Sequence, residues 1–137
     1  DYLNKELIKK AATIQQAIYA TPEASQELAD QARALASELE SIRFKLHGVE
    51  AKASWEEIPP AEIPVLRRMS NLMWIHYGST TNVTGTAKEQ YAIMKEIFPP
   101  IADRLKKIAE EKIPALEKEL NQLGAPWTPG RIPEIKE

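Results

Sequence analysis

The chain has 137 residues, of which 43% are apolar and 28% are charged, and its formal net charge is −2. That length suits one domain with a sizeable core, and the ordinary hydrophobicity excludes a disordered chain. The absence of cysteine excludes disulfides, thiolate metal sites and cysteine nucleophiles. The balance of 18 basic and 20 acidic residues offers no basic surface for nucleic acid. No apolar run approaches ~18 residues, so no membrane span is predicted.

Two amphipathic helices are predicted in the first third of the chain. Over residues 2–19, apolar side chains recur every three or four positions, at Leu3, Leu7, Ala11, Ile14 and Ile18. A second helix is predicted over residues 22–47, with Thr21 as its N-cap and Pro22 at its first helical position. It carries the clearest heptad pattern of the chain, at Leu28, Ala32, Leu35, Leu39, Ile42 and Leu46. Gly48 is predicted to end it.

A third helix is predicted over residues 61–77, but its start is ambiguous. Pro60 and Pro64 are each suited to the first helical position, and a proline deeper in the helix would disrupt its hydrogen bonds. The apolar stripe continues through Leu66, Met69, Leu72, Met73 and His76. Trp74 is assigned to the core end of this helix, which Gly78 is predicted to close.

The longest helix is predicted over residues 87–123. Thr86 and Glu89 have the spacing of a capping box at its start, and Gly124 follows its end. An extended tail over residues 125–137 completes the chain.

Three prolines fall inside this fourth helix. The apolar positions keep their phase through the pair Pro99-Pro100 and through Pro114, which indicates kinks within one helix. A break near Phe98 is the alternative, because a proline pair removes two backbone donors.

Four amphipathic helices joined by short connections predict an all-α fold, an antiparallel up-down-up-down four-helix bundle. In this prediction the fourth helix is kinked at its prolines, and residues 1–137 form a single helical-bundle domain. The chain starts at Asp1 rather than at Met and becomes helical at once, so we interpret it as a fragment of a larger protein.

The interior of a helical bundle most often gains chemistry from a metal or a haem. The chain has two histidines, His47 and His76, and neither has an acidic residue three positions earlier. Both fall at C-terminal ends of neighbouring helices, so an antiparallel bundle holds them at opposite ends. No metal site and no cofactor are predicted.

Catalytic patterns are equally weak. The loop over residues 78–86 precedes a helix but lacks the lysine of a phosphate-binding loop. Adjacent carboxylates such as Glu110 and Glu111 point about 100° apart on a helix and cannot flank one bond. No catalytic residue is predicted.

Two tryptophans are the tentative contacts with a partner or a ligand. Trp55 and Trp127 fall in a predicted linker and in the tail, where an exposed indole can anchor a protein or a sugar ring. The alternative is that each folds back to cover an apolar end of the bundle.

Two stretches carry a family resemblance. They are Trp74-Ile-His-Tyr-Gly-Ser-Thr-Thr81 with Gln90-Tyr91, and Ile113-Pro-Ala-Leu-Glu117 with Leu123-Gly-Ala-Pro-Trp-Thr-Pro-Gly-Arg131. Together they resemble the helical C-terminal region of large bacterial proteins built on β-propellers of BNR or sortilin (VPS10)-like repeats, which are often labelled glycosyl hydrolases. The chain departs from that pattern at Tyr77, where the family has tryptophan.

The resemblance implies that upstream propellers of the same chain are the partner and carry any activity, in an exported protein that is periplasmic or secreted. Most of the chain is then a non-catalytic C-terminal helical domain with a structural or assembly role. A glycan- or protein-binding module is the first alternative. The second is that the loop over residues 78–86 contributes to a site on the parent enzyme. A homo-oligomer is also compatible with the helix stripes.

Overall fold

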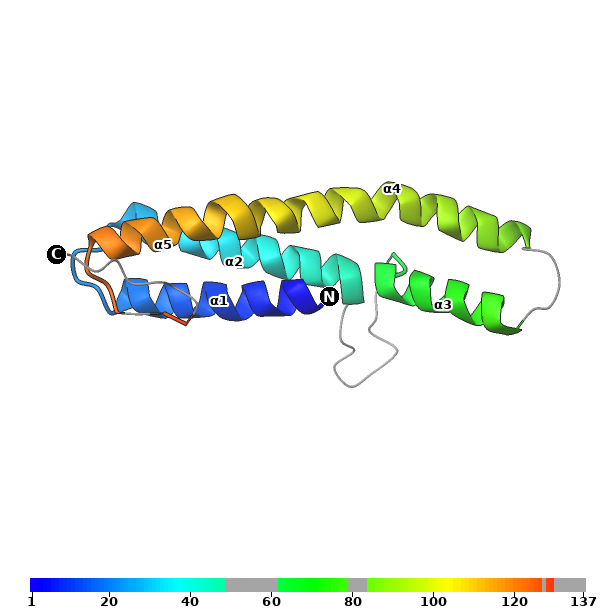
Figure 1. Ribbon diagram of the computed structural model, residues 1–137, viewed down its shortest axis with the longest axis horizontal. Coiled ribbons are helices and arrows are strands. Elements are labelled where there is room, and N and C mark those ends of the chain that lie inside the picture. The colour runs from blue at the N-terminus through cyan, green and yellow to red at the C-terminus, as the bar shows by residue number, and fades with distance from the viewer. Residues whose placement is uncertain (49–61, 79–83, 127, 130–137) are drawn as a thin grey trace. The chain divides into compact units, whose positions relative to one another are not determined.

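The computed structural model of the chain describes residues 1–48, 62–78, 84–126 and 128–129 (Figure 1). All regular secondary structure in these residues is helical, which confirms the all-α class. The helices are α1 (Tyr2–Tyr19), α2 (Gln26–His47), α3 (Val65–Gly78), α4 (Gly85–Lys107) and α5 (Ile113–Gln122), and the π-helical turn η2 (Ile108–Lys112) joins the last two. The up-down order of the helices stays a prediction.

The chain divides into two compact units, each described here by itself. The first comprises Asp1–Ser41 and Arg104–Glu137, and the second comprises Ile42–Asp103. The boundary falls inside α2 and inside α4, so each of these helices contributes residues to both units. The prediction of a single domain over residues 1–137 stays a prediction.

The first unit is a three-helix core. α1 packs on α5, and an ion pair of 2.9 Å joins Lys10 Nζ to Glu117 Oε1 between them (Figure 1). α1 also meets α2, where Gln15 Nε2 donates to the carbonyl oxygen of Ala32 at 3.4 Å. The fully buried large side chains of this core are Ile14, Leu28, Leu39, Ile108, Ile113 and Leu120. Leu3, predicted on the α1 stripe, is instead 46% exposed.

The apolar stripe of α2 is buried as predicted along the whole helix, from Leu28 to Leu46. The predicted start of this helix is wrong, because α2 begins at Gln26 and its cap is Ser25, whose Oγ accepts from the Leu28 amide at 3.2 Å. Thr21 serves the preceding helix instead, since its buried hydroxyl donates to the Ala17 carbonyl oxygen at 2.7 Å. Thr21 thus lies at the end of α1, four residues before Ser25, and the observed cap of α2 is Ser25.

Pro114 is accommodated by a π turn that periodicity did not predict. The amide of Ile113 donates to the carbonyl oxygen of Ile108, five residues back, which is the π-helical pattern. A proline cannot donate to the carbonyl four residues earlier and its ring crowds that carbonyl, here that of Glu110. Because Glu110 lies inside η2, the widened turn falls where the proline requires space, and α5 continues the helix.

The pair Pro99-Pro100 lies inside α4, which continues to Lys107. A break near Phe98 therefore does not occur, whereas a kink at the pair stays a prediction. Both prolines and the preceding Lys95 and Glu96 are exposed, so water can serve the carbonyl groups that lose their donors.

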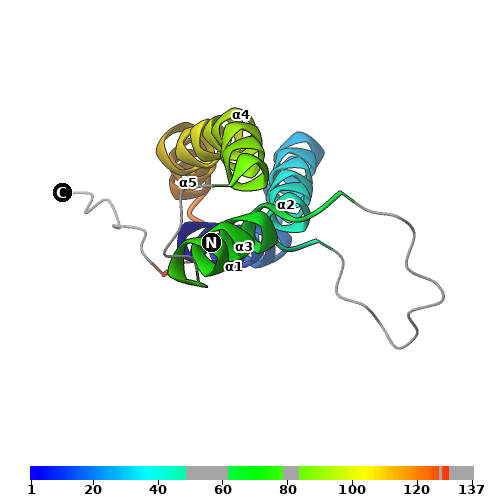
Figure 2. The ribbon, with the colours of Figure 1, turned by 90° about the vertical axis from the view of Figure 1, so that its right-hand side faces the viewer.

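The second unit contains the end of α2, all of α3 and most of α4 (Figure 2). α3 begins after Pro64, whose carbonyl oxygen accepts from the Arg68 amide at 3.0 Å, so Pro64 is the residue before the first helical one. Pro60 lies outside the described residues. α4 begins at Gly85 rather than near Ala87, because Thr84 Oγ1 accepts from the Ala87 amide at 3.3 Å and replaces the predicted Thr86 cap.

Two glycines end helices in the left-handed conformation, as predicted from their positions. Gly48 has φ +78° after α2, and Gly124 has φ +66° after α5. At Gly124 the amide of Ala125 reaches back to the Leu120 carbonyl oxygen at 3.0 Å, which is the Schellman pattern. A Cβ at Gly48 would lie 2.6 Å from Cγ of Pro64, whereas a Cβ at Gly124 would meet open space.

The two glycines therefore form a matched pair for mutation. Gly124→Ala is expected to lower the free energy of unfolding by about 1 kcal/mol, the cost of a side chain at positive φ. Gly48→Ala carries the same cost and also forces the Pro64 ring to move, so a loss of at least about 2 kcal/mol is expected. Urea denaturation measures both. Equal losses would contradict the close approach of Gly48 and Pro64.

Asn4 is a fully buried polar residue in the core of the first unit. It stands on the α1 stripe three residues before Leu7 and is 0% exposed. Neither its amide nitrogen nor its amide oxygen has a hydrogen-bond partner among the described residues. Burying such a group unpaired opposes folding by about 1–3 kcal/mol.

Asn4→Leu is accordingly expected to raise the free energy of unfolding by about 1–2 kcal/mol, because leucine repeats the branched shape of asparagine without its polar atoms. The control is Gln16→Leu at an exposed position of the same helix, where a change within about 0.5 kcal/mol is expected. Denaturant titration of both variants is the measurement. A destabilised Asn4→Leu protein would indicate that the amide is satisfied after all, for instance by a buried water.

Candidate functional site

α3 carries two apolar faces, and this is the feature that most calls for a partner. Its inner face packs within the second unit. Val65 on this face is 4% exposed, and Arg68 Nη1 donates to Gln90 Oε1 of α4 at 2.7 Å. Leu72 and Ile75 are half-buried on the same side of the helix. α3 therefore already has one face packed within its own unit.

The second face, here called the outer face of α3, consists of Met69, Met73, Trp74 and Tyr77. Their exposed fractions are 43, 55, 76 and 86%. Met69, Met73 and Tyr77 follow one another at a spacing of four, which aligns them in one stripe, and Trp74 lies beside it. Single exposed apolar residues need no explanation, but a contiguous stripe of large ones marks an interaction surface.

The prediction that Trp74 belongs to the core is wrong. The side of α3 that packs on its own unit carries Val65, Leu72 and Ile75. Trp74 lies on a different side of the helix and is 76% exposed. Met69 and Met73 share this outcome. The helical period of the apolar residues assigns them to a face of the helix. It does not tell which of two apolar faces packs within the same chain.

Arg67 borders the outer face and is exposed in the first turn of α3. That turn contains no acidic residue, and Arg67 makes no ion pair with any residue of the described chain. The amino end of a helix is already electropositive, so the arginine increases a local positive potential. The outer face is thus apolar along its length and cationic at its amino end.

α4 also exposes aromatic rings, but one of them has a partner. Tyr91 is 58% exposed, and the ammonium of Lys95 lies over its ring, 5.6 Å from the centroid. Such a cation–π contact one helical turn away accounts for an exposed tyrosine on a solvated helix. Tyr91 therefore does not require an external partner.

A second candidate lies in the first unit, as an open groove of about 310 Å³ between α2 and the segment formed by η2 and α5. Its lining comprises Gln31, Ala34, Leu35, Glu38, Lys112, Ala115 and Leu116. Alanine at two of these positions leaves room between the helices. The groove is apolar except at Gln31, Glu38 and Lys112.

Glu38 joins two cations across this unit. Its Oε2 accepts from Lys112 in a close ion pair, and its Oε1 accepts from Arg104 Nε at 3.3 Å and Nη2 at 3.2 Å. The hydrogen bond from Lys112 is the main cause that lowers the pKa of Glu38, opposed by partial burial and assisted by the charges of both cations. These groups satisfy one another, so we assign them to joining α2 with η2 and α4 rather than to a ligand.

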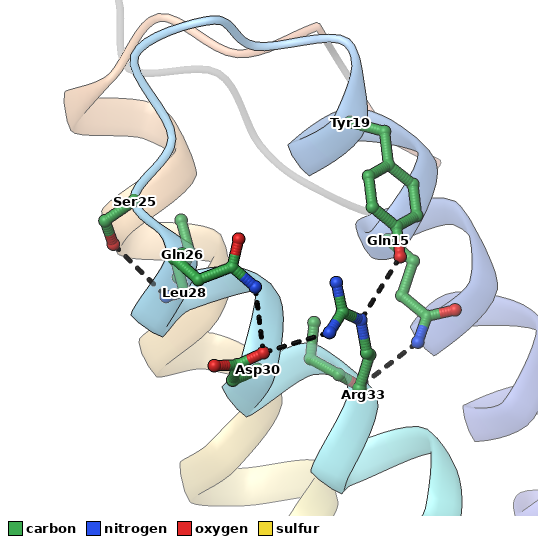
Figure 3. A network of polar contacts seen from close by, with 8 residues as sticks. Gln15, Tyr19, Ser25, Gln26, Leu28, Asp30 and Arg33 are labelled. Atoms are coloured by element: carbon green, nitrogen blue, oxygen red, sulfur yellow. Dashed lines mark hydrogen bonds and ion pairs between the residues drawn. The ribbon is translucent and has the colours of Figure 1, made fainter.

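A polar network near the connection of α1 and α2 has the same structural character (Figure 3). Arg33 donates from Nε to the Tyr19 hydroxyl at 3.4 Å and pairs through Nη1 with Asp30 at 3.0 Å. Gln26 donates to the same carboxylate at 3.1 Å. Each of these residues makes at least one polar contact within the same unit, and the contact between Arg33 and Tyr19 joins α2 to α1.

The two tryptophans predicted as contacts, Trp55 and Trp127, lie outside the described residues, and so does most of the loop over residues 78–86. The side chain of His76 is likewise outside them. Among the described residues, no three histidine, aspartate or glutamate side chains gather as a metal site would require. No described helix combines the length and apolarity of a membrane span. Sequence reasoning missed the outer face of α3, although its signal, apolar residues on two sides of one short helix, was present.

Comparison of the chain with protein-family models, with curated proteins and with solved structures found no match.

The ion triad generates a prediction. Glu38→Gln is expected to lower the free energy of unfolding by about 1 kcal/mol at neutral pH, because two cations lose their shared carboxylate. The control is Glu119→Gln, an exposed position of α5 for which no change beyond about 0.5 kcal/mol is expected.

The same pair of proteins has an expected pH dependence. The pKa of Glu38 is lowered in the folded state, so its contribution is complete above the unfolded pKa of about 4.3 and is lost as the pH falls through the lower folded value. Urea titrations from neutral to acidic pH should show the wild type and Glu38→Gln converging. A constant difference down to the lowest pH would contradict the assignment.

Proposed function

We propose that residues 1–137 form a non-catalytic helical domain with a structural or assembly role. On the family resemblance noted above, the domain is appended to propellers of the same chain, which carry any glycosidase activity, in a protein located outside the cytoplasm. The role assigned to this part of the chain is to bind protein surface rather than to transform a substrate.

The observation that supports the proposal is the outer face of α3. Four large side chains, Met69, Met73, Trp74 and Tyr77, remain in water while the opposite side of the same helix packs on its own unit. Folding leaves that apolar area in water, so burying it against a partner would contribute about 25 cal/mol per Å² that the isolated chain does not gain. Methionine and aromatic side chains are the types that interfaces enrich.

Two experiments separate this role from the alternatives. Removal of residues 1–137 from the longer protein is expected to change its assembly or thermal stability while its chemical step persists. Glycosidase assays on the isolated chain, with a panel of chromogenic glycosides, are expected to give no turnover. Turnover by the isolated chain would overturn the proposal, and so would a deletion that leaves assembly and stability unchanged.

The outer face also has a stability prediction. Trp74→Ala is expected to change the free energy of unfolding by no more than about 0.5 kcal/mol, because residue Trp74 is 76% exposed. Leu39→Ala, at a fully buried position of α2, is the contrasting variant and is expected to cost about 2–5 kcal/mol. Denaturation at low micromolar protein concentration makes the measurement. A loss of several kcal/mol for Trp74→Ala would mean that the face serves the fold.

A further inference from the structure

We propose that the outer face of α3 binds the same face of a second copy of this chain, with the two α3 helices antiparallel. This inference rests on the proposed assembly role and names its partner. It is carried by three properties of α3: the extent of the face, its spacing, and the location of its charge.

The extent of the face suits a weak dimer. The exposed fractions of Met69, Met73, Trp74 and Tyr77 correspond to roughly 500 Å² per copy, since a large aromatic side chain alone presents ~150–250 Å². Two copies would bury about 1,000 Å², at the lower edge of specific interfaces. A pair that forms in the micromolar range is therefore expected.

The spacing suits a two-fold axis. In a two-fold symmetric dimer, if residue i of one copy contacts residue j of the other, then j also contacts i. Met73 lies midway between Met69 and Tyr77 in the sequence. With the axis at Met73, the two copies of Met73 meet each other and each Met69 meets the Tyr77 of the other copy. A residue repeat of four is also the ridge spacing by which helices most often pack.

The charge distribution selects the antiparallel direction. Arg67 stands in the first turn of α3, where no acid accompanies it. Parallel helices would bring the two arginines and the two electropositive helix ends together. In the antiparallel pair, Arg67 lies level with the carboxyl end of the other α3, just past Gly78, where the last carbonyl groups carry partial negative charge. The same face is thus repulsive in one direction and complementary in the other.

Single-cysteine variants test this arrangement directly, because the chain contains no cysteine. Met73→Cys is expected to form a disulfide-linked dimer under mild oxidation. Met69→Cys and Tyr77→Cys are each expected to link poorly alone, since their copies would be separated by about 12 Å along the helix, but to link with each other when mixed. Tyr2→Cys, at a 78% exposed position of α1, gives the background rate of random collision.

The outcomes divide cleanly. Self-linking by all three α3 variants without preference for the mixture would indicate parallel helices and overturn the arrangement. Linking no faster than Tyr2→Cys would overturn the dimer itself. A tryptophan emission shift on vesicles of mixed zwitterionic and anionic lipid that is seen in the wild type but not in Trp74→Phe, in a chain that stays monomeric, would identify a lipid surface as the occupant and also overturn it.

Sedimentation equilibrium of the uncrosslinked chain provides an independent readout. The wild type is expected to approach the mass of two copies as concentration rises, while Met73→Glu, which brings two carboxylates together at the axis, stays at the mass of one copy. Tyr2→Glu is the matched control and should dimerise normally. A monomeric wild type overturns the dimer alone, because the assembly role is judged separately by the deletion experiment on the longer protein.

Discussion

The buried stripe of α2 is the constraint on which the described structure depends. Leucine, isoleucine and alanine recur there at the heptad spacing from Leu28 to Leu46, and all of them are buried. Most of the stability of a helix in a protein comes from packing of its apolar face, so covering this stripe along its whole length stabilises α2. In the first unit α1, η2 and α5 supply that cover, and the polar contacts of Glu38 and Arg33 lie at its margins.

Local hydrogen bonds at the helix ends and at Pro114 let the helices keep their apolar stripes buried. Ser25, Thr84 and Gly124 satisfy backbone groups at helix ends, and the π turn η2 gives Pro114 the space that an α-helical turn lacks. By adding one residue to a turn, η2 also changes the phase of the helix, and Ile108 at its start and Ile113 just after it both remain buried. The proline is thereby tolerated without loss of the apolar stripe.

Periodicity predicted the all-helical class, the extent of α1 and the buried face of α2, because apolar residues at spacings of three and four define one stripe. Helix starts were less predictable, since Thr21 and Ser25 are both good cap residues, and only the structure shows that Ser25 Oγ accepts from the Leu28 amide. The π turn was not predictable, because a proline at Pro114 suggests a kink equally well. The unpaired Asn4 was missed, since one amide does not interrupt an apolar pattern.

The candidate site was missed for a different reason. An apolar stripe predicts that a helix face packs against other protein, but it does not tell whether that protein is the same chain or a partner. α3 is the case in which this matters, because Val65 and Arg68 show one side already packed while Met73 and Trp74 remain in water. α3 has two apolar sides and a cationic first turn, and its own unit buries only one of these sides. In the proposed dimer an oppositely directed α3 of a second copy covers this remaining side, and the positive charge at the amino end of the helix is what favours that direction.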